Sequence, residues 1–72
     1  MTLDMAQKGQ MLLIKKVERD DVRPQAMRLG LYEGALLECS ESIRNGPVIL
    51  RSDFCEIAVG KRIAEQITVT KV

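Results

Sequence analysis

The sequence contains no histidine and no tryptophan, and only one tyrosine and one phenylalanine. Histidine is the usual general base beside a nucleophilic serine or cysteine, so its absence argues against most hydrolytic sites. The neighbouring carboxylates Asp20 and Asp21 fit a helix start, and Glu38 and Glu41 fit a solvated face. We therefore expect no enzymatic activity and no catalytic residues.

Cysteine is scarce as well, because Cys39 and Cys55 are the only two and lie far apart in the sequence. No Cys-x-x-Cys pair is present, and no histidine could complete a zinc site. Free cysteine packs as a small hydrophobic residue, so we expect two buried, reduced thiols. Glycine-rich phosphate-binding loops are also missing, and we expect neither a bound metal nor another cofactor.

Long apolar runs and a strong charge excess are the next absences. The aliphatic run near the start, Met11–Ile14, is far shorter than the ~20 residues of a membrane-spanning helix. No signal peptide is visible at residues 1–8, which leads us to expect a cytoplasmic protein without membrane insertion. The formal net charge of +1 gives no basic footprint, so nucleic acid is a poor candidate partner.

The 72 residues are enough for one small core, so we expect a single domain spanning residues 1–72. A composition of 46% hydrophobic and 29% charged residues is typical of a folded chain. A core of this size supplies roughly 3–5 kcal/mol of net stability, which leaves little margin for a strained site.

The first predicted strand follows Gly9 and contains an irregularity. Leu12 and Ile14 share one face, whereas Val17 does not fit the period of two residues that a strand requires. An extra residue in the strand would correct the mismatch, so we predict a bulge or bend near Lys15 and Lys16.

A short helix is predicted next. Asp20 and Asp21 are suited to accept hydrogen bonds from the first helical amides. Gly30 is suited to end the helix in a left-handed conformation, with Leu31 folding back against the last turn. The apolar stripe that faces the core recurs at helical spacing and consists of Val22, Ala26 and Leu29.

Four further strands are predicted from alternation and turn signals. The second follows Gly34 and turns Leu37 and Cys39 inward. Asn45 and Gly46 favour a tight hairpin with two positive φ angles. The remaining elements are strands over Val48–Arg51, Phe54–Val59 and Ile67–Lys71, with a helical turn within Lys61–Gln66. The fold class is mainly β, a small five-stranded SH3-like barrel with one helix after its first strand.

The candidate binding residues surround the end of the predicted helix. Tyr32 and Glu33 follow it directly and Arg28 precedes its end, and tyrosine and arginine are common in binding hot spots. Tyr32 could equally cover one end of the barrel. The pairs Lys15-Lys16 and Lys61-Arg62 are typical of solvated surface, with contact to an anionic partner as the alternative.

Several segments in their order resemble the FeoA family, small bacterial cytoplasmic proteins that accompany the FeoB ferrous-iron transporter. Met27–Leu31 followed by Gly34 resembles the family core Arg-Leu-x-x-Leu-Gly-Leu-x-x-Gly. Asn45–Arg51 resembles the family's Gly-x-Pro hairpin. Glu33 stands where the family commonly has proline.

The resemblance implies a cytoplasmic accessory protein that binds the cytoplasmic part of a FeoB-like transporter and modulates it. Arg28, Tyr32 and Glu33, chosen for their residue types and position, are the candidate partner-binding residues. The alternative is a regulatory domain that senses a divalent metal, related to the C-terminal domain of metal-dependent repressors. The oligomeric state stays open.

Overall fold

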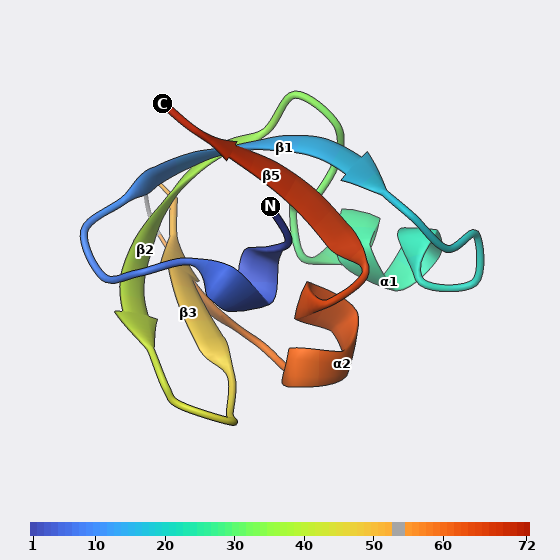
Figure 1. Ribbon diagram of the computed structural model, residues 1–72. Helices are drawn as coiled ribbons and strands as arrows, with labels where there is room; N and C mark the ends of the chain where they lie inside the picture. The colour runs from blue at the N-terminus through green and yellow to red at the C-terminus, as the bar shows by residue number, and fades with distance from the viewer. Residues whose placement is uncertain (53–54) are drawn as a thin grey trace.

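The computed structural model describes residues 1–52 and 55–72. Five antiparallel strands form one sheet in the order β4-β3-β2-β1-β5. They are β1 (Met11–Val17), β2 (Leu36–Ser42), β3 (Val48–Arg51), β4 (Glu56–Val59) and β5 (Ile67–Lys71). Figure 1 shows β5 crossing over β1 while β2 and β3 curve away beneath, so the sheet wraps around its core. The predicted five-stranded SH3-like fold is confirmed.

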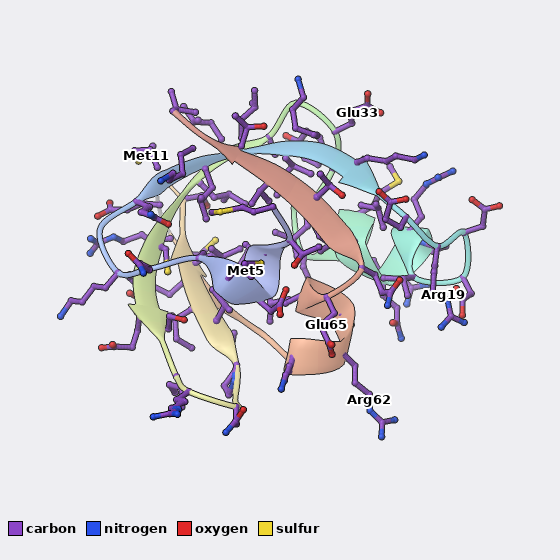
Figure 2. The ribbon with its side chains drawn as sticks, in the orientation of Figure 1. Met5, Met11, Arg19, Glu33, Arg62 and Glu65 are labelled. Atoms are coloured by element: carbon purple, nitrogen blue, oxygen red, sulfur yellow. The ribbon has the colours of Figure 1, made fainter. Side chains whose placement is uncertain are left out.

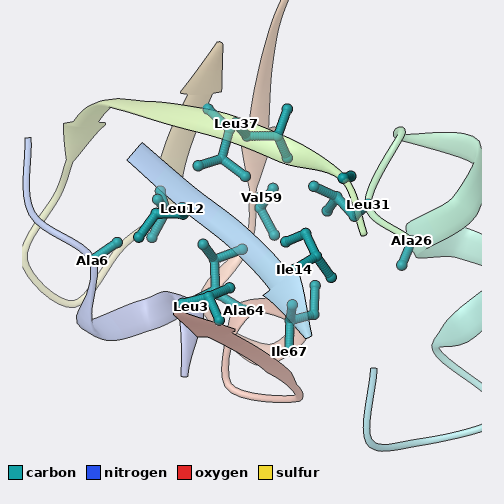
Figure 3. Close-up of a cluster of buried hydrophobic side chains, with 14 of the residues drawn as sticks. Leu3, Ala6, Leu12, Ile14, Ala26, Leu31, Leu37, Val59, Ala64 and Ile67 are labelled. Carbon is teal, nitrogen blue, oxygen red and sulfur yellow. The ribbon is translucent and has the colours of Figure 1, made fainter. Parts of the chain in front are cut away.

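Alternation along the strands fills the interior with aliphatic side chains. Leu12 and Ile14 of β1 and Ile67 of β5 all belong to this cluster, as Figure 3 shows. Two short helical segments close the core: η1 (Leu3–Met5) buries Leu3, and α2 (Lys61–Ala64) buries Ala64. No polar or charged residue in the described chain is buried, so burial of apolar surface is the main stabilising contribution.

The predicted irregularity in β1 is confirmed. Ile14 pairs with Val69 of β5, but the next pair joins Lys16 to Thr68, so the register shifts between them. One extra residue on β1 leaves Lys15 and Lys16 both exposed and returns Val17 to the core. The bulge thus reconciles the spacing of the apolar residues with a continuous strand.

The helix α1 (Arg23–Arg28) lies where the sequence predicts it, with Ala26 buried. The predicted capping by Asp20 and Asp21 is wrong, because Val22 occupies the N-cap position and no side chain caps the helix. The Arg19 carbonyl accepts the N–H groups of both Val22 and Arg23, so a preceding turn already satisfies these donors. The Asp20 carboxylate instead pairs with the Arg23 guanidinium at 3.2 Å.

The end of α1 confirms the prediction for Gly30, whose φ is 83°. The Gly30 N–H donates to the Met27 carbonyl at 3.0 Å, and the Leu31 N–H donates to the Ala26 carbonyl at 2.8 Å. These two bonds form a Schellman motif, which satisfies carbonyls that would otherwise lack partners. Leu31 has 0% of its surface exposed, so the chain is anchored in the core directly after the helix.

The hairpin between β2 and β3 differs from its prediction. The Gly46 N–H donates to the Ile43 carbonyl at 2.9 Å, and Asn45 has a φ of 57°, but Gly46 has no positive φ. This is the pattern of a type II turn, in which only the third residue requires a positive φ.

The fourth strand is shorter than predicted, because β4 begins at Glu56. Cys55 precedes it and is exposed, so the prediction of two buried thiols is wrong for Cys55 and right for Cys39. Asp53 and Phe54, predicted for the preceding turn and the strand start, lie outside the described residues.

Gly30→Val should destabilise the fold by about 1 kcal/mol or more, because a Cβ atom disfavours the left-handed backbone. The melting temperature should fall by about 4–8 °C. Nothing lies within 4 Å of an added Cβ, so the cost is conformational rather than steric. Gly30→Asn is the control and should lose less, since asparagine tolerates this region. Equal melting temperatures for Gly30→Val and wild type would contradict the assigned helix end.

Candidate functional site

The loop between α1 and β2 is held by backbone hydrogen bonds at both ends. The Ala35 N–H donates to the Tyr32 carbonyl at 2.9 Å, and Gly34 has a φ of 93°, as the third residue of a type II turn requires. The Gly34 N–H donates to the Ile14 carbonyl at 2.8 Å, and the Ile14 N–H donates to the Ala35 carbonyl at 2.9 Å. These bonds fix the loop against β1.

Glu33 occupies the second position of this turn. Proline is favoured there because its fixed φ matches a type II turn. The turn formed by residues 32–35 thus suits proline at its second position and is also compatible with glutamate. Figure 2 shows the Glu33 side chain projecting outward from the loop.

Tyr32 lies between two hollows of the surface and is 52% exposed. The first hollow, here the cationic cleft, has a volume of about 540 Å³. Its lining residues come from the end of β1, from α1 and from the loop, and are Lys15, Lys16, Val17, Arg23, Met27, Leu31, Tyr32 and Glu33. The second, here the helix-end hollow, measures about 450 Å³ and includes Arg28 and Leu36.

The three predicted binding residues are therefore near one another without sharing a single hollow. Tyr32 lines both, Glu33 lines the cationic cleft, and Arg28 lines the helix-end hollow. The sequence did not predict that Lys15 and Lys16 lie beside Tyr32 and Glu33 in one cleft. The predicted bulge could have indicated that both lysines are exposed on one surface, because a bulge turns two consecutive residues outward.

Ion pairs neutralise the cleft only in part. The Arg23 guanidinium pairs with Asp20 and also donates to the Val17 carbonyl at 3.4 Å. The Lys16 ammonium lies 3.8 Å from the Glu18 carboxylate. Lys15 forms no ion pair with any residue of 1–52 or 55–72. The lining itself thus holds three cations and one carboxylate, and the carboxylates of Asp20 and Glu18 lie beside two of these cations.

Comparison with known proteins decides the family, since the FeoA domain matches residues 1–71. The chain belongs to the FeoA domain family. The sequence resemblance is thereby confirmed, and membership supports a role in ferrous-iron transport. No curated protein sequence matches the chain.

Solved structures agree with the family. A crystal structure of the iron uptake regulatory protein FeoA has a TM-score of 0.91 and 25% identity, over 100% of this chain and 97% of that chain. A solution structure of FeoA from Chlorobium tepidum has a TM-score of 0.83 and 27% identity, over 100% of this chain and 70% of that chain. These findings indicate no enzyme family.

The protein ScaR with bound Zn²⁺ also matches, with a TM-score of 0.86 and 26% identity. The FeoA domain aligns over its full length with 37% of the ScaR chain. The likeness therefore concerns one part of a longer protein.

Metal-ligating side chains do not gather in the described part of the FeoA domain. Among residues 1–52 and 55–72, no three of the His, Cys, Asp and Glu side chains lie close enough to hold an ion. No helix in the same residues is long and apolar enough to cross a membrane.

The two thiols have different environments. Burial raises the pKa of the Cys39 thiol, and the nearby carboxylates of Glu41 and Glu38 act in the same direction. The thiol lies 3.5 Å from the Glu41 carbonyl, to which it donates. Unfolding exposes this thiol, so the unfolded chain releases its proton at a lower pH than the folded chain does. Stability should therefore fall as pH rises from the ordinary thiol pKa through the raised one. Cys55 is exposed, and its sulfur lies 3.5 Å from the Ser52 hydroxyl.

One thiol of the native protein should react with an aromatic disulfide reagent at the rate of an exposed cysteine, and the other far more slowly. Cys39 becomes accessible only when the fold opens, which for a domain of roughly 3–5 kcal/mol slows its reaction by about a hundredfold or more. Cys55→Ser should remove the fast phase and leave the slow one. A fast phase that survives this substitution would contradict the placement of Cys39 in the core.

Proposed function

We propose that this FeoA domain is a cytoplasmic accessory protein of ferrous-iron transport that binds the cytoplasmic part of a FeoB-like transporter and modulates it. Family membership supports the transport role. The observation that carries the binding role is the position of Tyr32, half-exposed on a fixed loop between two hollows.

Tyr32 has the properties of an interface anchor. Its carbonyl is used in the turn, whereas its hydroxyl makes no hydrogen bond to any described residue. An aromatic side chain on a rigid loop buries a large area on binding and loses little conformational entropy. Hot-spot residues of this kind insert beside pockets near the centre of an interface.

Arg28 and Glu33 flank this anchor on its two sides. Arg28 lies in the last turn of α1 and borders the helix-end hollow, and Glu33 borders the cationic cleft. Charged residues around an apolar anchor give an interface its specificity and orientation more than its affinity. We assign that role to Arg28 and Glu33.

A second candidate function is that of a domain that senses a divalent metal. The likeness to ScaR with bound Zn²⁺ favours it. The described donor set does not, because it lacks a cluster of ligating side chains. Binding of a transporter without a resident metal is therefore the function that the site supports best.

Tyr32→Ala should weaken binding to the cytoplasmic domain of the cognate FeoB-like transporter about thirtyfold. Loss of an aromatic anchor costs ~2 kcal/mol or more, whereas an exposed substitution changes stability by less than ~0.5 kcal/mol. Met5→Ala, at an exposed apolar position on η1, is the control and should leave affinity unchanged. Affinity would be measured by calorimetric titration and stability by a thermal melt.

Unchanged affinity of Tyr32→Ala with a normal melt would move the contact surface elsewhere. A large loss of stability would instead make Tyr32 part of the structural framework. Either result contradicts the assigned role.

Reduced, purified protein should retain no stoichiometric Fe²⁺ or Zn²⁺ after desalting, because the described residues offer no ligand cluster. The measurement is metal analysis after equilibrium dialysis, with Cys55→Ser as the control for adventitious binding at the exposed thiol. One retained equivalent in both proteins would favour the metal-sensing function over the proposed one.

A further inference from the structure

The cationic cleft and the helix-end hollow differ in the charge of their linings. Lys15, Lys16 and Arg23 line the cleft with a single carboxylate, Glu33, whereas Arg28 is the charged residue of the helix-end hollow. The geometry points to the cleft as the binding site for a short acidic segment of the partner that also carries an apolar side chain. This inference rests on the proposed function, because the segment belongs to the transporter's cytoplasmic part.

The two lysines are available to a partner. The bulge in β1 exposes both, where regular alternation would have turned one of them inward. Lys15 has no ion-pair partner within the described residues, and the pair between Lys16 and Glu18 joins two well-exposed side chains. Exposed pairs of this kind contribute about 0–1 kcal/mol, so exchanging Glu18 for a partner's carboxylate costs little.

Apolar side chains also line the cleft. Met27 of α1 is 59% exposed and Tyr32 of the loop is 52% exposed. A methionine side chain adapts its shape to an incoming apolar group, and an aromatic ring offers a flat face. Because cations and exposed apolar side chains share one lining, the cleft fits a segment that places an apolar residue beside aspartate or glutamate.

The size and total charge favour a peptide over a nucleic acid. A volume of about 540 Å³ accommodates a few side chains. Binding along a phosphate backbone requires many neutralising contacts, and the whole chain has a net charge of only +1. Lys15, together with Lys16 and Arg23 in their exposed ion pairs, suits a single acidic segment.

The test compares two charge reversals that give the same net charge. The double variant Lys15→Glu with Lys16→Glu should weaken binding to the transporter's cytoplasmic domain tenfold or more. The double variant Lys61→Glu with Arg62→Glu should change affinity by less than twofold, because Arg62 projects from α2, away from Glu33, as Figure 2 shows. Wild-type affinity should also fall between low and moderate salt, and the cleft variant should lose this dependence.

Each other outcome has a distinct meaning. If the wild-type domain does not bind at all, the proposed function and this inference both fail. If it binds and the reversal at Lys15 and Lys16 leaves affinity unchanged, or weakens it no more than the reversal at Lys61 and Arg62, this inference alone fails. Tighter binding by the cleft variant would make the segment basic and would also overturn it.

A variant that misfolds would also lose binding, so the test includes a substitution that should improve binding. Glu18→Gln removes the carboxylate that pairs with Lys16 at 3.8 Å and should tighten binding about threefold, since the lysine is then free for an acidic segment. A photo-reactive amino acid in place of Met27 should crosslink to a segment containing aspartate or glutamate. Weaker binding of Glu18→Gln, or a crosslinked segment without acidic residues, would contradict the inference.

Discussion

The bulge in β1 is the feature on which both the fold and the candidate site depend. Ile14 and Val17 both belong in the core, yet residues three apart in a regular strand face opposite ways. One extra residue resolves this conflict and increases the local twist, which helps a five-stranded sheet to wrap around its interior. The same extra residue turns Lys15 and Lys16 outward together. Charge in the cleft is therefore a direct consequence of how the core is filled.

The end of α1 makes the second half of the site rigid. Gly30 and Leu31 close the helix, and the following turn is bonded to Ile14 immediately before the bulge. Ile14 therefore positions both the lysines that follow it in β1 and the loop that carries Tyr32. A domain with a small core has little stability to spare for a strained backbone. In this loop the positive φ angles fall only on glycines, Gly30 and Gly34, so Tyr32 is presented without backbone strain.

Local patterns in the sequence predict the features that depend on neighbouring residues. The misplaced Val17 predicts the bulge, and Gly30 with Leu31 predicts the helix end, because each follows from spacing or from backbone geometry. Features that depend on which of several hydrogen-bond or ion-pair partners a side chain takes are harder to predict from the sequence. Asp20 pairs with Arg23 instead of capping α1, since the Arg19 carbonyl has already taken the amides.

The candidate site was accessible only in part for the same reason. Tyr32 and Glu33 follow the helix and are visible in the sequence, whereas their position in the same cleft as Lys15 depends on how the loop bonds to β1. The exposure of Cys55 could be predicted only if the start of β4 were known, because β4 begins one residue after Cys55. Alternation alone had extended the strand to include it.

Mapping the partner's footprint on the domain tests the central claim most directly, namely that the surface formed by the bulge and the loop after α1 is where the transporter binds. The measurement is amide chemical-shift perturbation of isotope-labelled protein, titrated with the transporter's cytoplasmic domain. The account predicts that the largest changes gather at residues 15–17 and 27–34, with little change in α2 or in the hairpin between β2 and β3. Changes concentrated on α2 or β4, with residues 15–17 and 27–34 unaffected, would contradict it.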